Sequence, residues 1–170
     1  MLSDKDRTRR TVCVGLLSTF ALMLSYVESI LPLDFGIRGF RIGLANIAVV
    51  TALYTVGAGN AATVNCIRIV LAALLFGTPI SFLYSVSGGA VSLAVMIFMK
   101  KVCGCKTSGC SVAGGVFHNL AQLCVACLFT KTAKIIYLMP LMIVSGIITG
   151  LVVALASGLL ISRVVGMLKK

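Results

Sequence analysis

The residues with the clearest chemical potential lie in segment 109–122, which reads GCSVAGGVFHNLAQ. It opens a long apolar stretch and contains His118, the single histidine of the chain. In a helix, Gly114, His118 and Gln122 share one stripe, because residues four apart stand one above the other. The glycine would let a neighbouring helix come close, with the imidazole and the carboxamide pointing into that contact. Two interpretations stay open: these side chains tie two helices together, or they form a wall of a ligand site.

Two ionisable side chains within apolar segments, Glu28 and Arg68, are the next candidates. An arginine at mid-membrane costs roughly 2.5–3.5 kcal/mol on insertion scales, so Arg68 needs a carboxylate, carbonyl groups or water as its partner. Glu28 is the one acidic residue inside any apolar segment, which makes it the obvious partner. A structural ion pair and a ligand bridging the two groups both fit. Asn46 is expected at a depth similar to that of Glu28.

The composition defines the environment in which these residues work. Hydrophobic residues make up 59% of the chain and charged residues 11%, and the mean hydropathy is +1.12. A soluble domain carries roughly 25% charged residues, so the sequence predicts an integral membrane protein. Its 170 residues hold several spans of about 20 residues, and we expect a single membrane domain over 1–170. The net charge of +11 does not indicate nucleic-acid binding, because the positive residues flank apolar segments.

Six apolar segments predict an all-α bundle of six transmembrane helices. Only helices and closed barrels satisfy the backbone in lipid, and these segments are too long and too uniformly apolar for barrel strands. Turn-forming or basic stretches separate them, such as 57–60 (GAGN) and 100–108 (KKVCGCKTS). The predicted spans are about 11–31, 41–56, 61–76, 80–99, 110–130 and 135–162.

The distribution of positive charge predicts that both termini are cytoplasmic. With six spans, ten Lys and Arg residues fall on the N-terminal side of the membrane and four on the other, and Arg68 lies within a span. Cytoplasmic loops carry the excess of positive charge. The ten are Lys5, Arg7, Arg9, Arg10, Lys100, Lys101, Lys106, Arg163, Lys169 and Lys170, and the four are Arg38, Arg41, Lys131 and Lys134.

Catalysis, metals and cofactors find little support in the residue types. The chain has four acidic residues and no carboxylate pair to hold magnesium on a diphosphate. It has no glycine-rich phosphate loop with its lysine, so it cannot power transport itself. Cys103, Cys105 and Cys110 lack a fourth ligand and the usual zinc-site spacing. We therefore expect no metal, no cofactor and no enzymatic activity of the chain alone.

Several motifs together resemble a known family. They are Glu28-Ser-x-x-Pro32, Arg41-x-Gly43-x-x-Asn46-Ile, Arg68, Ser85-x-x-Gly88-Gly-x-x-Ser92 and Gly109-x-Ser-x-x-Gly114-x-x-x-His118-Asn-x-x-Gln122. Over about 11–160 the chain resembles the Gx transporter family, also labelled heptaprenyl diphosphate synthase component I. That family is similar to the substrate-binding S components of energy-coupling factor transporters.

The resemblance implies a six-helix membrane protein that binds a small vitamin- or cofactor-like ligand near the outer face. It also implies a separate transmembrane coupling subunit and two ATPases as partners. Arg41 fits either an ordinary interfacial arginine or a residue that captures an anionic or carbonyl-bearing ligand. The candidate ligand-binding residues are Glu28, Arg41, Asn46, Arg68, Ser85, His118, Asn119 and Gln122.

Two other functions stay open. The synthase label implies a non-catalytic membrane partner of a prenyl diphosphate synthase catalytic subunit, with a role in making the menaquinone side chain. A structural membrane subunit without a ligand is the third possibility.

Overall fold

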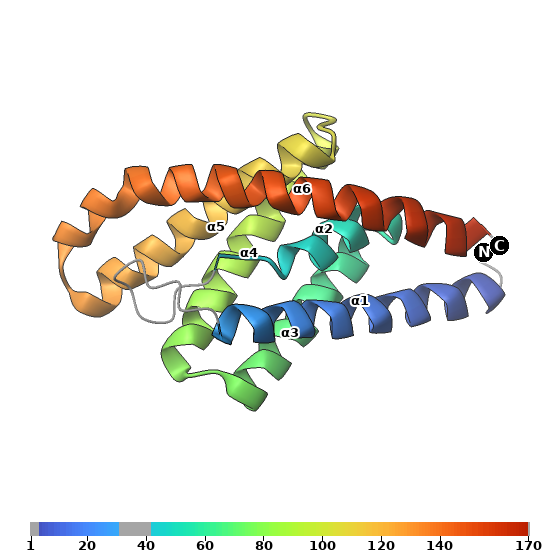
Figure 1. The fold of residues 1–170 in the computed structure, drawn as a ribbon, viewed down its shortest axis with the longest axis horizontal. Coiled ribbons are helices and arrows are strands. Elements are labelled where there is room, and N and C mark those ends of the chain that lie inside the picture. Colours follow the sequence, from blue (N-terminus) through green and yellow to red (C-terminus); the bar gives the residue numbers. More distant parts are fainter. Residues whose placement is uncertain (1–3, 31–41, 170) are drawn as a thin grey trace.

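The apolar segments fold as helices that form an elongated bundle (Figure 1). A computed structural model describes residues 4–30 and 42–169, and these contain no strand. The first turn of α1 and the last turn of α6 lie at the same end of the bundle (Figure 1). The helices are α1 (Asp4–Ile30), α2 (Asn46–Thr55), α3 (Ala58–Phe76), α4 (Pro79–Lys101), α5 (Thr107–Thr130) and α6 (Met139–Lys169), with a 3₁₀-helix η1 (Ala133–Leu138) before α6.

Five of these helical segments are long and apolar enough to cross a membrane. They are α1, α3, α4, α5 and the segment 134–167, which includes α6. Their outward faces carry large apolar side chains, such as Leu74 at 76% exposure and Leu155 at 75%. Such a surface is stable in hydrocarbon and not in water. The chain is a multi-pass membrane protein.

The second predicted span is shorter than the sequence indicated. We expected it to begin at Arg41, whereas α2 begins at Asn46 and has ten residues. Gly43 adopts φ +91°, a conformation that an α-helix does not contain, and Leu44 and Ala45 form a turn. The helix therefore starts only after this turn.

Helix α2 lies in the middle of the bundle. Its first eight residues, Asn46 through Leu53, are all buried. It packs against α1, α3 and α6, and its apolar side chains form the main core with residues of α1, α3 and α4. A short helix enclosed on every side in this way has little contact with lipid.

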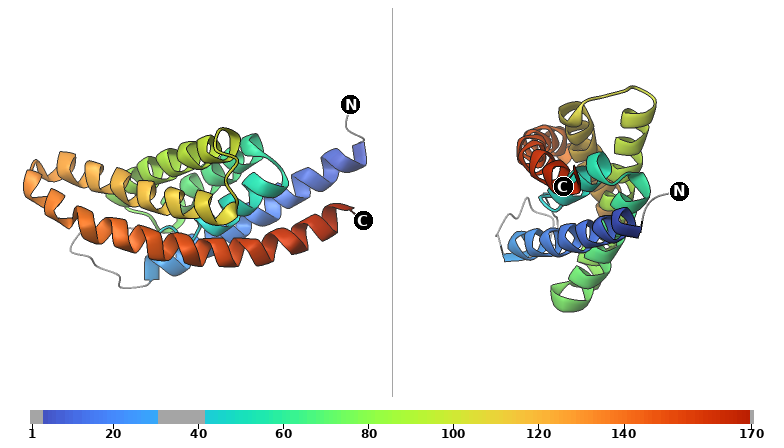
Figure 2. Two further views of the ribbon diagram at one scale, coloured as in Figure 1. Left: turned by 90° about the horizontal axis from the view of Figure 1, so that it is seen from above. Right: turned by 90° about the vertical axis from the view of Figure 1, so that its right-hand side faces the viewer.

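Helices α5 and α6 run side by side and pack most closely where glycines face each other (Figure 2). A Cβ atom built on Gly115 would lie 2.4 Å from the carbonyl oxygen of Gly146. A Cβ atom on Gly150 would lie 2.6 Å from the Cα atom of Val112. The two backbones therefore touch directly, as small residues permit in membrane helices.

Local signals explain two of the helix starts. The Thr78 hydroxyl accepts from the Ser81 N–H at 3.2 Å, and the Ser81 hydroxyl accepts from the Thr78 N–H at 2.9 Å. This capping box, with Pro79 at the first helical position, starts α4. The sixth predicted span began at Ile135, but residues up to Leu138 form η1 and α6 follows with Pro140 in its first turn. Proline suits that turn because its missing N–H has no acceptor there.

Candidate ligand-binding site

Glu28 lies in the last turn of α1 and joins it to the start of α2. Its side chain is 8% exposed, and its Oε1 atom accepts hydrogen bonds at 2.5 Å from the backbone N–H groups of Gly43 and Leu44. Hydrogen bonds from N–H groups to a carboxylate are charge-assisted and stronger than neutral ones. Glu28 thus holds the turn that precedes α2 in a fixed position.

His118 fills a gap between two glycines. Its side chain is 1% exposed, and a Cβ atom built on Gly88 of α4 would lie 2.7–2.9 Å from three atoms of the imidazole ring. A Cβ atom on Gly43 would lie 3.5 Å from Cδ2 of the same ring. The imidazole therefore lies between the turn before α2 and the middle of α4.

Gln122 contacts that ring from the same helix. Its Nε2 atom lies 2.8 Å from Nε2 of His118, one helical turn earlier on α5. The two side chains share one hydrogen bond, and which of the two nitrogens donates depends on the tautomer of the ring.

Asn46 and Ser92 extend the polar contacts from α2 to α4. Asn46 is the first residue of α2, and its Nδ2 atom donates to the Ser92 hydroxyl at 3.5 Å. Both side chains are buried, at 5% and 0% exposure. The Nδ2 atom of Asn46 would also lie 3.2 Å from a Cβ atom on Gly43. Asn46 is thus beside the same turn that His118 approaches.

Arg68 and Asn65 form a polar pair on α3. The Nε and Nη2 atoms of Arg68 donate to Asn65 Oδ1 at 3.1 and 2.9 Å, and Arg68 is 2% exposed. The Asn65 amide would lie 3.1 Å from a Cβ atom on Gly89 of α4. Helices α3 and α5 both pack on α4 and do not contact each other. Arg68 and His118 therefore approach α4 from two sides, through its neighbouring glycines Gly88 and Gly89.

Several hydrogen bonds hold Glu28 and Arg68 in place. The hydrogen bonds described for Glu28 come from the backbone at 43 and 44, and those of Arg68 go to Asn65. Helices α1 and α3, which carry these two residues, also pack directly against each other.

Together these residues form a buried group that we call the polar cluster. It surrounds the turn before α2 and the two glycines of α4, and it combines a carboxylate, a guanidinium, an imidazole, carboxamides and a hydroxyl. Such a set offers hydrogen-bond donors and acceptors to a small polar molecule. Within 4–30 and 42–169 no three His, Cys, Asp or Glu side chains are grouped to hold a metal ion. The polar cluster consists of Glu28, Asn46, Asn65, Arg68, Ser92, His118 and Gln122.

The structure places the other predicted site residues differently. Ser85 is buried on α4, one turn before Gly88. Asn119 points to α6, where its Nδ2 atom donates to the Met142 carbonyl at 3.0 Å and to the Ser145 hydroxyl at 2.8 Å. It therefore lies in the contact between α5 and α6 and not beside the imidazole. Arg41 lies outside the described residues.

Asn65 and Ser92 belong to the polar cluster, although sequence reasoning did not select them as site residues. Each had a local signal. Asn65 precedes Arg68 by one helical turn, and Ser92 follows Gly88 by one turn. Both spacings place the side chain next to a residue that was already of interest.

The cysteine-bearing loop lies at the end of the bundle where α4 ends and α5 begins. The Tyr54 hydroxyl donates to the Cys105 carbonyl at 2.8 Å and lies 3.0 Å from Cys110 Sγ. Burial raises the pKa of the Cys105 thiol, and the neighbouring Cys103 and Cys110 thiols raise it further. The loop therefore tethers α2 to α4 and α5, and the Cys105 thiol stays protonated at neutral pH.

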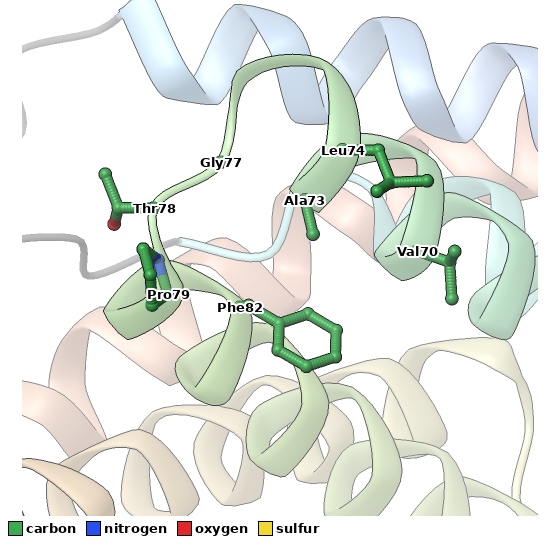
Figure 3. A pocket seen from close by; sticks show the side chains of 7 residues that line it. All are labelled: Val70, Ala73, Leu74, Gly77, Thr78, Pro79 and Phe82. Atoms are coloured by element: carbon green, nitrogen blue, oxygen red, sulfur yellow. The ribbon is translucent and has the colours of Figure 1, made fainter.

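A surface pocket between α3 and α4 is separate from the polar cluster (Figure 3). It has a volume of about 400 Å³ and is lined by Val70, Ala73, Leu74, Gly77, Thr78, Pro79 and Phe82. Its lining is mainly apolar and includes none of the predicted ligand-binding residues. The side chains of Val70, Leu74 and Phe82 belong to the apolar outer surface that faces lipid.

Comparison with known proteins gives one match. Searches of curated proteins and of solved structures returned no significant similarity. The family described as heptaprenyl diphosphate synthase component I matches residues 17–160, which include every member of the polar cluster. The chain belongs to the heptaprenyl diphosphate synthase component I family.

Proposed function

We propose that this chain is the substrate-binding membrane subunit of an uptake transporter for a small vitamin- or cofactor-like ligand. The observation that carries the proposal is the convergence of the polar cluster on the turn before α2 and on Gly88 and Gly89 of α4. Polar and ionisable side chains are expensive inside a membrane, and where they occur they mark substrate or ion pathways.

The way in which the cluster is built also favours binding. The broken start of α2 lies against side chains of α1, α4 and α5. In transporters, interrupted helices commonly place backbone groups at the substrate site. The ligand would contact the imidazole edge, the carboxamides and the guanidinium. Its partners would be a transmembrane coupling subunit and ATPases, since the sequence has no nucleotide-binding loop of its own.

The test is mass spectrometry of small molecules that co-purify with the full chain in nanodiscs. We expect a polar metabolite with the wild type. His118→Ala should retain at least about tenfold less, because it removes a buried hydrogen-bonding ring from the site. Asn119→Ala is the matched control: it changes a buried polar residue one position away that contacts α6 instead.

The comparison of these two variants decides the outcome. Equal retention of the metabolite by the wild type and both variants would show that the cluster only ties helices together. Equal loss in both variants, with equal loss of thermal stability, would contradict a role specific to His118.

The family description favours a second candidate. As a non-catalytic component of a heptaprenyl diphosphate synthase, the chain would bind a prenyl synthase catalytic subunit. The measurement is elongation of an allylic diphosphate by that subunit with and without this chain in nanodiscs. An increase in product length or rate that His118→Ala leaves unchanged would favour this function over uptake.

A further inference from the structure

A cleft lies between the N-terminal part of α1 and the first turn of α3. Helix α1 begins and α6 ends at this end of the bundle (Figure 1). The cleft has a volume of about 350 Å³ and is lined by Arg7, Arg10, Thr11, Val14 and Asn60. Arg7 and Arg10 are three residues apart on α1, so their side chains emerge on the same side of the helix. None of the described residues that line the cleft is acidic.

Asp4 and Asp6 precede Arg7 and Arg10 by one helical turn on α1, but they do not line the cleft. Both arginine side chains are exposed, and in residues 4–30 and 42–169 neither guanidinium forms a hydrogen bond or an ion pair. The Thr11 hydroxyl, which also lines the cleft, donates to the Arg7 carbonyl at 3.1 Å. Two like charges beside one cleft repel each other, and an anion between them would remove that repulsion. A guanidinium also matches the geometry of a phosphate group.

The position of the cleft selects the type of anion. Arg7 and Arg10 mark the end of the polar part of α1, and the apolar part follows at once with Val12 at 55% exposure and Leu16 at 62%. The cleft thus lies at the border between a charged surface and a lipid-facing surface. A free phosphate ion would contact only the charged side. A phospholipid has its phosphate and its acyl chains on the two sides of such a border.

We propose that this cleft binds the headgroup of an anionic phospholipid, with the phosphate between Arg7 and Arg10 and the acyl chains along the exposed apolar face of α1. The site fixes one lipid beside the junction of α1 and α3. It is independent of the polar cluster, since the two share no residue.

The experiment is a native mass spectrometry titration of the full delipidated chain in detergent with phosphatidylglycerol. Arg7→Gln/Arg10→Gln should weaken the Kd of the first lipid about thirtyfold, at about 1 kcal/mol for each basic residue near an anionic surface. The matched control is Lys5→Gln/Arg9→Gln, which removes the same charge from exposed positions of the same helix outside the cleft. It should change the Kd less than threefold.

Two further measurements keep the result interpretable. Arg7→Lys/Arg10→Lys keeps the charge but not the bidentate geometry, so it should give an intermediate Kd even if the glutamine variant folds poorly. Millimolar inorganic phosphate should leave the bound lipid in place. Equal weakening by both glutamine pairs would overturn the proposal by showing a non-specific charge effect. Displacement of the lipid by phosphate would overturn it in favour of a site for free anions.

Discussion

Glycine serves opposite purposes in two regions of this bundle. Between α5 and α6, Gly115 and Gly146 bring two backbones together, and a Cβ atom on Gly115 would meet a carbonyl oxygen at 2.4 Å. In α4, Gly88 leaves room for a side chain, and a Cβ atom there would meet the imidazole of His118 at 2.7 Å. The two distances are similar, but the groups that would have to move are different. A backbone in a packed helix cannot yield, whereas a ring can rotate away.

The difference separates a rigid region from an adjustable one. Around Gly115 and Gly146 the contact of α5 with α6 depends on the absence of side chains, and the Asn119 carboxamide beside it is bonded across to α6. The contact of α5 with α4 around Gly88 includes the polar side chains of His118 and Ser92. Stability should therefore depend mainly on the first contact, and ligand retention mainly on the second.

The largest effect is expected for Gly115→Ala. The added methyl group would overlap the Gly146 carbonyl, and separating the two helices should cost about 3 kcal/mol of unfolding free energy. The measurement is equilibrium unfolding in mixed micelles of a mild detergent and SDS. Gly158→Ala on α6 is the control, because no atom lies within 4 Å of its added methyl group, and it should change stability by less than about 1 kcal/mol. Equal effects of the two substitutions would refute the close backbone contact.

Gly88→Ala should have a smaller effect, which depends on His118. The methyl group would push the ring away from α4 at a cost of about 2 kcal/mol. If the ring is the obstacle, the same substitution in a His118→Ala background should cost about 1–2 kcal/mol less. The double-mutant cycle is measured by the same unfolding assay. Additive costs would show that the α4 backbone and not the imidazole resists the methyl group, and the contrast with Gly115 would disappear.

The smallest effect is the difference between alanine substitutions at Gly43 and Gly57, which distinguishes backbone strain from side-chain contact. Gly43 and Gly57 both have positive φ, at +91° and +100°, so alanine at either should cost about 1–3 kcal/mol. Nothing lies within 4 Å of a Cβ atom on Gly57, whereas one on Gly43 would lie 3.2 Å from Asn46 Nδ2. The loss of unfolding free energy should therefore be larger for Gly43→Ala than for Gly57→Ala in unfolding assays, by about 0.5–1 kcal/mol. A larger cost at Gly57 would show that the turn before α2 is not tightly packed against the polar cluster.

The helices could be predicted where lipid determines them. The predicted fourth and fifth spans, 80–99 and 110–130, lie within α4 and α5, because long apolar runs leave the backbone no alternative to a helix. The prediction failed at the start of α2. There the chain follows the conformation of Gly43 and hydrogen bonds to Glu28, a residue 15 positions earlier, and no local pattern indicates a contact at that separation.

In the site, too, local spacing could be predicted and contacts between helices could not. The stripe that carries His118 and Gln122 could be predicted from four-residue spacing, and the structure joins the two side chains at 2.8 Å. Asn119 was grouped with them because it is adjacent in sequence. One residue along a helix is a rotation of about 100°, which turns Asn119 toward α6. Which neighbouring helix a residue faces is a property of the packed bundle and could not be inferred from one chain segment.

The shortness of α2 has a consequence for the electric field inside the protein. Ten residues rise about 15 Å, roughly half the thickness of the hydrocarbon layer, so a helix end must lie within the membrane. The first turn of a helix carries about half a positive elementary charge, which low-dielectric surroundings do not screen. Because the neighbouring helices enclose this end, it is a permanent positive pole in the interior, and the Glu28 carboxylate beside residues 43 and 44 is its local negative counterpart.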